Sequence, residues 1–225
     1  MLDRRHTDRE FESELETLRE RVLLMGARVE EMLTLAFRSF TERDLRTAQN
    51  TIPLDRQIDQ LEIDIDELCL QILARRQPVA SDLRFITTTL KLVTDLERIA
   101  DLCVNVCERV VELSSEPWPA DDTPIPVVAA IAQGMVHDAL DSFVDHNAVQ
   151  ARDVIERDGV VDAYYAQLFP QLMSQMMADP KLVTRSTRLL SVGKYIERIG
   201  DHATNIAEMV VFMVNGQDVR HPDPS

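Results

Sequence analysis

The sequence has little of what builds sheets, tight turns and disulfide-linked folds. Its 225 residues include only 6 glycines and 3 cysteines, and aromatic residues make up 5%. This scarcity, together with many Leu, Val, Ile, Glu, Asp and Arg residues, favours helices over sheets. The hydrophobic fraction of 45% is enough for a proper core.

Basic residues are also fewer than acidic residues. The chain has 24 Lys and Arg against 39 Asp and Glu, which gives a net charge of −15. A nucleic-acid-binding surface needs a basic footprint, and electrostatic docking on anionic lipid needs one as well. The charge therefore argues against both kinds of partner.

No segment has the features of a targeting signal or a membrane span. The first ten residues, MLDRRHTDRE, are charged, and no apolar run approaches the ~20 residues of a membrane span. We therefore expect a cytoplasmic protein without membrane insertion. Cys69, Cys103 and Cys107 cannot all pair within one chain, and we expect them to be reduced and buried rather than bound to zinc.

Several enzyme signatures are missing. The sequence contains no GxSxG, P-loop or HExxH motif, and none of its five histidines has a glutamate three residues before it. It therefore gives no support to nucleophilic, nucleotide-binding, zinc-protease or ferritin-like di-iron chemistry.

What the sequence does contain is one segment that occurs twice. Residues 95–108 read DLERIADLCVNVCE, and residues 195–208 read YIERIGDHATNIAE. The offset of 100 residues is constant along the segment, which points to an internal duplication. The residues that recur in type are Glu97, Arg98, Ile99, Asp101, Asn105 and Glu108, followed by Glu197, Arg198, Ile199, Asp201, Asn205 and Glu208.

On a helix, each copy separates into an apolar face and an acidic ridge. With about 100° per residue, the acidic and amide residues fall within a stripe about 80° wide, opposite the apolar ones. Neither carboxylate of the pair has a base three or four residues after it along the ridge, and we expect Arg98 and Arg198 to point elsewhere. A solvated helix face would explain one such pair, but its recurrence in both halves favours a functional site.

Apolar residues at steps of three and four, interrupted by prolines, divide the chain into six long helices. In the first half we expect helices over 11–40, 54–76 and 81–113, a short helical piece over 43–49 and an interruption at 51–53. In the second half we expect helices over 125–144, 148–178 and 180–215, the middle one broken at 157–159. We expect Ser81 or the residue before it, Thr123, Asn147 and Asp179 to cap helices, and Gly216 to end the last one.

The predicted fold is therefore all-α, with two tandem three-helix bundles. The bundles cover residues 1–115 and 125–216, joined by a proline-rich linker at 116–124 and followed by a frayed tail at 217–225.

Each bundle also carries a DxxxD pair near the start of its second helix. Asp55 and Asp59 recur as Asp158 and Asp162 at an offset of 103. In each bundle, the DxxxD pair would lie beside the ExxxD pair of the third helix. The two pairs together would form a patch of four carboxylates. Such a patch is self-repelling, and a divalent or trivalent cation is the usual remedy. Oxygen ligands suit Mg, Ca, Mn or iron rather than zinc or copper.

Together, the doubled E-R-I-[GA]-D-x-x-x-N motif, the DLR at 82–84, the paired DxxxD elements and the tandem repeat resemble the PhoU family of bacterial accessory regulators of phosphate-specific transport. The resemblance covers about residues 8–214. It implies multinuclear metal clusters on the outer face of each bundle, with iron as the best-known occupant. The implied ligands are Asp55, Asp59, Glu97 and Asp101 for one cluster and Asp158, Asp162, Glu197 and Asp201 for the other.

The same ridges continue beyond the implied ligands, with Asn105, Glu108, Asn205 and Glu208 as candidate supporting residues. His202 is expected at the surface or facing a partner rather than on the metal. The copies differ, because the first has Ala100 where the second has Gly200, and the second lacks a DLR. We therefore expect two similar sites whose occupancy is not identical.

The resemblance also implies a function. PhoU-like proteins are non-enzymatic negative regulators that keep phosphate-starvation genes off when phosphate is plentiful. Their implied partners are the transporter's ATPase subunit and a sensor histidine kinase, and a homodimer is compatible with the sequence. Two alternatives stay open: a carboxylate-bridged metalloenzyme, either an oxidase or a phosphohydrolase, and a metal-free helical interaction module.

Overall fold

A computed structural model describes the backbone of residues 2–115 and 123–219, and the side chains from residue 9 onward within these ranges. The predicted linker at 116–124 therefore lies mostly outside the described residues, and the predicted tail partly so. The described helices are α1 (Leu2–Glu42), α2 (Leu45–Thr51), η1 (Ile52–Leu54), α3 (Asp55–Arg76), α4 (Ala80–Leu113), α5 (Ile125–Val144), α6 (Ala148–Ala178), η2 (Pro180–Leu182) and α7 (Val183–Asn215).

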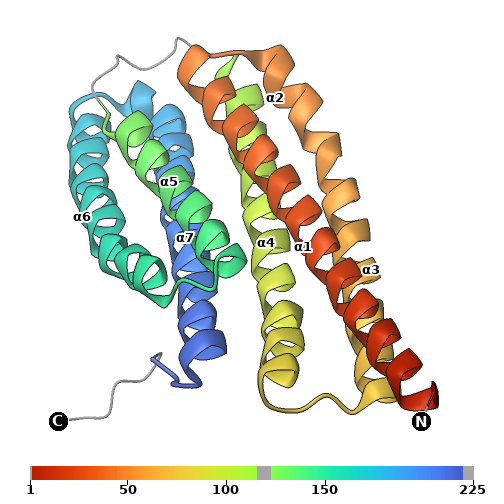
Figure 1. The fold of residues 1–225 in the computed structure, drawn as a ribbon. Coiled ribbons are helices and arrows are strands. Elements are labelled where there is room, and N and C mark those ends of the chain that lie inside the picture. Colours follow the sequence, from red (N-terminus) through yellow and green to blue (C-terminus); the bar gives the residue numbers. More distant parts are fainter. Residues whose placement is uncertain (1, 116–122, 220–225) are drawn as a thin grey trace, which may run out of the picture.

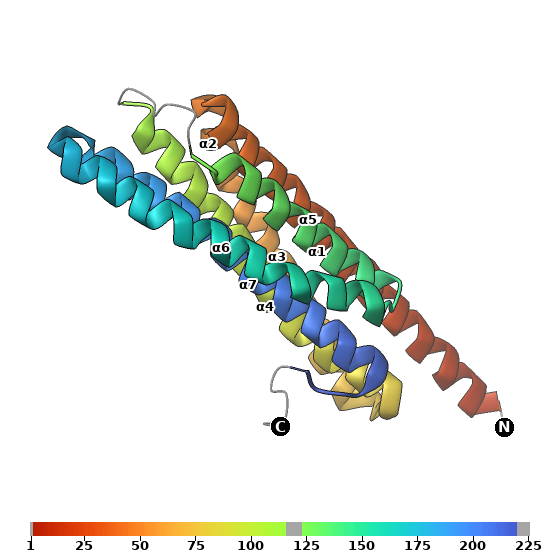
Figure 2. The same cartoon turned by 90° about the vertical axis from the view of Figure 1, so that its left-hand side faces the viewer.

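Six long helices form two three-helix bundles that lie side by side (Figure 1). Helices α1, α3 and α4 make the first bundle, and α5, α6 and α7 make the second. The bundles meet where α4 packs on α7 and α1 packs on α5, so α3 and α6 are outermost. In the view turned by 90°, the long helices follow one common axis (Figure 2). The prediction of an all-α fold with two tandem bundles is confirmed.

The apolar stripes of all six helices meet in one continuous core. Ile99 and Ile199, from the two copies of the repeated motif, are both fully buried. The three cysteines are free and buried, as predicted. Burial raises the pKa of Cys107 to about 11, so this thiol stays protonated at neutral pH and packs as a small apolar side chain.

The corner between the first and second helices of a bundle has the same backbone structure in both bundles. Arg43 (φ +60°) and His146 (φ +52°) take the left-handed conformation that ends α1 and α5. Each is followed by a side-chain cap, Asp44 or Asn147, which accepts hydrogen bonds from backbone amides two and three residues later. The duplication read from the helix motif therefore extends to backbone geometry.

Two predicted features of the second helices have different outcomes. In the first half the α-helix is interrupted by the 3₁₀ turn η1, where Pro53 lacks an N–H to donate. The predicted break at 157–159 is wrong, because α6 runs from Ala148 to Ala178 without interruption. The position equivalent to Pro53 is Glu156, which has an N–H, and a single exposed glycine at 159 does not end a helix.

Some of the predicted helix caps are confirmed and others are wrong. Asn147 caps α6, Asp179 Oδ1 accepts from the amide of Lys181 at the start of η2, and Gly216 ends α7 at φ +68°. Ser81 and Thr123 do not act as caps. The N-cap positions of α4 and α5 are Val79 and Pro124, and neither makes a side-chain capping bond.

Helix α5 corrects the expectation about apolar runs. Its 20 residues are long and apolar enough to cross a membrane by length and composition. Half of that segment is buried inside the protein, where α5 packs against α1, α6 and α7. The core helix of a bundle passes the same test, so this finding alone does not identify a membrane helix.

Two glycines in the second bundle provide a matched test of packing. An added Cβ at Gly193 would lie 2.4 Å from Leu168 Cδ2, whereas nothing lies within 4 Å of one at Gly159. Gly159→Ala is expected to stabilise the protein by about 0.5–1 kcal/mol, because alanine restricts the unfolded chain. Gly193→Ala is expected to be less stable than Gly159→Ala by about 1–3 kcal/mol, the usual cost of overpacking. Urea unfolding measures both, and equal stabilities would contradict the close packing of α6 on α7.

Candidate metal centre

The first acidic patch lies where the start of α3 packs against the middle of α4. It consists of Asp55, Asp59 and Glu62 from α3 and Glu97 and Asp101 from α4. Burial raises the pKa of Asp55 to about 6, and the charges of Asp59 and Asp101 add to the rise. Burial also raises the pKa of Glu97, with the charge of Asp101 as the next cause. The predicted carboxylates of the first half therefore form one electrostatic cluster.

The second acidic patch repeats this arrangement between α6 and α7. Carboxylate oxygens of Asp162, Glu197 and Asp201 all lie within 4.8 Å of one another. Burial raises the pKa of Asp201, and the charges of Glu197 and Asp158 raise it further. Two helices that contact along their length thus bring three of the four carboxylates predicted for the second half within reach of one cation, and Asp158 interacts with them through its charge.

Each patch contains a buried carboxylate oxygen without a partner. Asp55 Oδ1 and Asp158 Oδ1, equivalent in the repeat, accept no hydrogen bond from the described residues. The Thr204 hydroxyl lies near enough to offset part of the rise in the pKa of Asp158, but it makes no hydrogen bond. A buried acceptor without a partner is costly, and a bound cation would satisfy it. An oxygen-only donor set suits a hard metal ion in its chemistry at both patches. Among the described residues, only the carboxylates of the second patch lie close enough together to share one ion, and those of the first patch do not.

One cation borders each patch, and for the first patch this contradicts the expectation that Arg98 points elsewhere. Lys194, three residues before Glu197, forms an ion pair with its carboxylate. Arg98 Nε lies 3.4 Å from Glu97 Oε2, and Arg98 Nη1 lies 3.6 Å from Asp101 Oδ2. The prediction failed for Arg98 because its long side chain bends back over its own helix. One cation beside four or five carboxylates leaves each patch with an excess of negative charge.

The two patches are not chemically equal. Glu62 belongs to the first patch, where burial raises its pKa and the nearby Thr94 hydroxyl offsets part of that rise. The equivalent position in the second half is Tyr165, and Lys194 lies over its ring at 5.5 Å from the centroid. The sequence contained a signal for Glu62, which lies three residues after Asp59 on the same face of α3. Each patch has one bordering cation, so the first patch, with one more carboxylate, is the more negative.

The raised pKa of Asp55 predicts a pH dependence of stability in chelator-treated protein. A folded-state pKa of about 6, above the ordinary 3.8, gives stability that is present below pH 4 and is lost as the pH rises through about 6. Urea unfolding should therefore show lower stability at pH 7.5 than at pH 5. Asp55→Asn should reduce this difference by on the order of 1–2 kcal/mol, allowing for partial solvation.

The matched control for that experiment is Asp153→Asn, at an exposed position on α6 outside both patches. It should keep the pH dependence of the unchanged protein. An unaltered pH dependence in Asp55→Asn would show that this carboxylate is not held in a buried, repulsive environment.

The four candidate supporting residues lie in different surroundings. Asn105 donates to the backbone carbonyl of Asp101 at 2.8 Å, and Glu108 is exposed beside Arg109. Asn205 instead donates to Asp95 Oδ1 on α4 at 3.2 Å. Glu208 lines a groove between α4 and α7. Asn105 therefore bonds to a residue of its own patch, whereas Asn205 bonds across the bundle junction.

His202 is not a surface side chain, contrary to the expectation. Its Nδ1 lies 2.7 Å from Asp95 Oδ1, so it bridges α7 to α4 across the junction of the bundles. Its side chain is 16% exposed. Only the packing of the second bundle on the first reveals this contact, since Asp95 and His202 lie 107 residues apart.

Comparison with known proteins agrees with this architecture. The PhoU domain matches twice, over residues 22–110 and 125–210. The chain is 41% identical over 217 residues to the phosphate-specific transport system accessory protein PhoU homolog of Pseudomonas aeruginosa, covering 96% of this chain and 90% of that protein. It is 34% identical to the Escherichia coli K12 accessory protein PhoU, with the same coverage.

The fold has a solved counterpart. The crystal structure of PhoU from Pseudomonas aeruginosa superposes with a TM-score of 0.90 at 40% identity, covering 92% of this chain and all of that one. The double match, the full-length identity and the superposition agree with the two-bundle architecture and its duplicated motif. The chain therefore belongs to the PhoU family.

Proposed function

We propose that this chain is a non-enzymatic regulator of phosphate uptake and of phosphate-starvation signalling, acting in the cytoplasm through protein partners. The names of its relatives support a role beside a phosphate-specific transport system. The observation that carries the proposal is the pair of acidic patches, which occupy the same position in both bundles. Two equivalent patches on a protein without a catalytic motif suit a scaffold better than an active site.

The metal part of the proposal rests on the carboxylates themselves. Residues Asp55, Asp59, Glu97 and Asp101 would hold one cluster, with Glu62 beside them, and Asp158, Asp162, Glu197 and Asp201 the other. Iron is the proposed occupant, and Mn, Mg or Ca would suit the same oxygen ligands. A bound cation would neutralise the repulsion within a patch and fasten the second helix of each bundle to the third.

The absence of enzymatic activity is supported by the composition of the patches. Among the described residues, the only group of His, Cys, Asp and Glu side chains close enough to share a metal ion consists of three carboxylates. The nearest histidine in sequence, His202, is engaged with Asp95. General acid–base chemistry near neutral pH commonly uses a histidine, which neither patch supplies.

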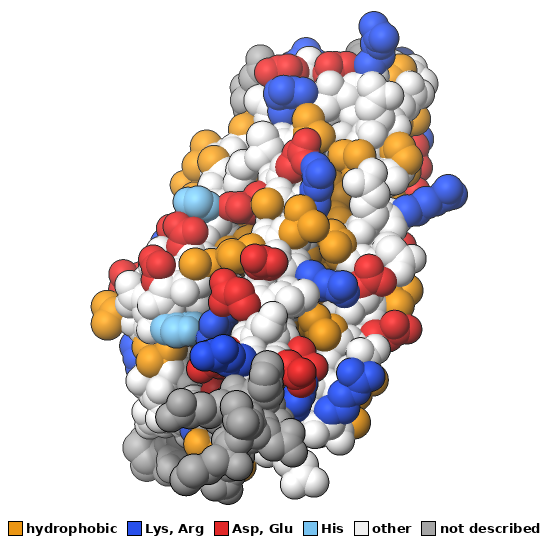
Figure 3. Space-filling model, turned by 45° about the vertical axis from the view of Figure 1, so that its right-hand side comes forward, with side chains coloured by type: hydrophobic (Ala, Val, Ile, Leu, Met, Phe, Trp, Pro, Cys, Tyr) orange, Lys and Arg blue, Asp and Glu red, His pale blue; other side chains and the backbone are white. Residues whose placement is uncertain are grey.

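Repression through protein partners rather than DNA is supported by charge. The net charge is −15. On the face shown in Figure 3, the described Lys and Arg side chains are scattered among acidic and hydrophobic ones and form no continuous basic stripe. Since phosphate contacts supply most non-specific DNA affinity, such a surface disfavours direct binding to a promoter. The proposed partners are the ATPase subunit of the transporter and a sensor histidine kinase.

Co-purification of the native protein without chelator or affinity-tag metal tests the proposal. Recovery of a transporter ATPase and a sensor kinase, with stoichiometric metal in the complex, is the expected result. Specific DNA binding at physiological salt would overturn the adaptor role. Turnover in an oxidase or phosphatase assay would favour the metalloenzyme, and metal-free protein after gentle handling would favour a bare helical module.

A further inference from the structure

The second acidic patch already holds one cation of its own. Lys194 lies three residues before Glu197 on α7, and its ammonium group forms an ion pair with Oε2 of that carboxylate. Its charge also reaches Asp201, where it offsets part of the rise in pKa that burial and the other carboxylates cause. Glu197 and Asp201 are two of the three residues whose carboxylate oxygens lie within 4.8 Å of one another. Lys194 therefore acts on the same carboxylates that a metal ion would need.

An aromatic ring helps to hold the ammonium group at this position. The Nζ atom of Lys194 lies over the ring of Tyr165 on α6, 5.5 Å from the ring centroid. A cation in this position is attracted by the negative face of the ring. The ring in turn packs against α7 at Gly193, where an added Cβ would lie 3.4 Å from Tyr165 Cδ2. Glu197 and Tyr165, on two different helices, thus define one place for the ammonium group.

The first bundle has different side chains at both positions. Thr94 is equivalent to Lys194 at the offset of 100, and Glu62 is equivalent to Tyr165 at the offset of 103. In the first bundle these two lie near each other, because the Thr94 hydroxyl affects the pKa of Glu62. The second bundle therefore has a cation over an aromatic ring where the first has a hydroxyl beside a carboxylate. Since the two positions interact in both bundles, Lys194 and Tyr165 form one unit.

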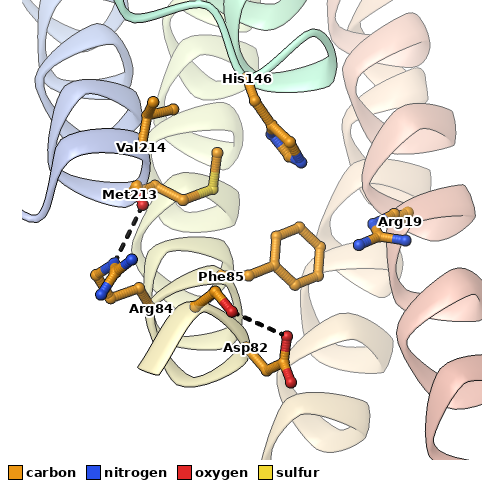
Figure 4. A pocket seen from close by; sticks show the side chains of 8 residues that line it. Arg19, Asp82, Arg84, Phe85, His146, Met213 and Val214 are labelled. Atoms are coloured by element: carbon orange, nitrogen blue, oxygen red, sulfur yellow. Dashed lines mark hydrogen bonds between the residues drawn. The ribbon is translucent and has the colours of Figure 1, made fainter. Parts of the chain in front are cut away.

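Basic side chains with a structural role in this protein join separate helices. Arg84 Nε donates to the backbone carbonyl of Met213 at 3.2 Å, which ties the start of α4 to the last turn of α7 (Figure 4). Arg76 Nε lies 2.8 Å from Glu14 Oε2 and ties α3 to α1. Lys194 differs, because its ion pair lies within α7 and its side chain is 45% exposed. Its ammonium group can therefore move into water without breaking an ion pair between helices.

We propose that Lys194 is a built-in counter-ion of the second patch, which an oxygen-preferring divalent cation must displace from Glu197 to bind there. The inference rests on the proposed metal sites and concerns how one of them fills. The metal ion and the ammonium group would both contact Glu197, and like charges at that distance repel. The lysine side chain is free to move away, whereas the carboxylates are held in place by the contact of α6 with α7.

A counter-ion of this kind makes metal binding at the second patch reversible. In the metal-free protein, the ammonium group reduces the repulsion among the four carboxylates, so the patch is less destabilising without metal. A metal ion then relieves less repulsion, and the lysine gives up its ion pair when the metal ion binds. Lys194 therefore stabilises the metal-free protein and weakens metal binding, which are effects that no ordinary surface lysine combines.

Titration of Mn²⁺ into chelator-treated full-length protein, followed by calorimetry and by paramagnetic broadening of amide signals, tests the inference. Broadening at Asp162 and Asp201 identifies binding at the second patch. Lys194→Gln is expected to tighten Mn²⁺ binding there by roughly tenfold, the effect of removing one neighbouring like charge from a partly exposed site. Without metal, the same variant should unfold at a lower urea concentration than the native chain, because the repulsion among the carboxylates is no longer offset.

Lys194→Arg keeps the positive charge and should keep Mn²⁺ binding as weak as in the native chain. Lys181→Gln is the matched control, because it removes an exposed lysine of the same half of the chain outside both patches, and it should change neither property. Binding that Lys181→Gln tightens to the same degree would indicate a general effect of net charge and overturn the inference.

Two further outcomes separate this inference from the proposed metal sites. Equal Mn²⁺ affinity at the second patch in the native chain and in Lys194→Gln would overturn the inference and leave the patch as a metal site. Absence of Mn²⁺ binding in every variant would overturn the proposed metal sites, and this inference with them.

Discussion

Replacing Ile199 with aspartate is expected to unfold the second bundle. Ile199 is fully buried in the continuous core, on the face of α7 opposite its acidic ridge. An aspartate there would bury a charge without a partner, which costs several kcal/mol or forces the backbone to open. Since domains of this size are stable by only about 5–15 kcal/mol, one such change removes much of the total. Loss of the cooperative thermal transition in circular dichroism is the expected result.

The matched control is Thr187→Asp, an exposed position near the start of the same helix. A negative charge there lies toward the N-terminus of α7, where the helix dipole favours it, so stability should be unchanged or slightly higher. Ile99→Asp should repeat the effect in the first bundle, because Ile99 is equally buried. Retained thermal stability in both core variants would show that the faces are assigned the wrong way round.

Neutralising one ExxxD pair, as Glu197→Gln with Asp201→Asn, is expected to remove the metal of the second patch and leave the fold intact. These side chains supply two of the three clustered oxygens, and amide groups are much weaker ligands for a hard cation. Their neutral forms also relieve the repulsion that raises the pKa of Asp201. Elemental analysis should show the metal content falling by about half if both patches fill equally.

A second acidic pair one helical turn apart provides the control for that variant. Glu12→Gln with Glu16→Gln changes two exposed residues of α1 that lie in neither patch. This control should keep its full metal content and its helix signal. An unchanged metal content in the α7 variant, or a collapsed helix signal, would contradict the placement of these carboxylates at a metal site on the bundle surface.

The fold was largely predictable because helix periodicity is a local property. Each long helix carries its own apolar stripe, so the six helices and their order followed from spacing alone. The errors lie where local signals are weak. Arg157–Gly159 resembled a break, yet the surrounding helix overrides one glycine, and Ser81 and Thr123 resembled caps without becoming them.

The carboxylates of the candidate centre were also predictable, because a repeated motif at constant phase marks them. Residues with no motif were harder to assign. Glu62 joins the first patch only because α3 packs against α4, and Lys194 borders the second by reaching one turn along its own helix. Position on a ridge did not predict the partner of Asn205, which bonds across the bundle junction to Asp95.

The sequence by itself determined the helical class, the duplication and the acidic faces, since each depends on the order of residues within a single helix. Only the tertiary structure decided how the two halves meet. The contact of His202 with Asp95 and the cavity at the DLR motif (Figure 4) join residues more than 60 positions apart. Their physical cause is the packing of α4 on α7 and of α1 on α5, which no local pattern encodes, because it depends on the combined shape of all six apolar stripes.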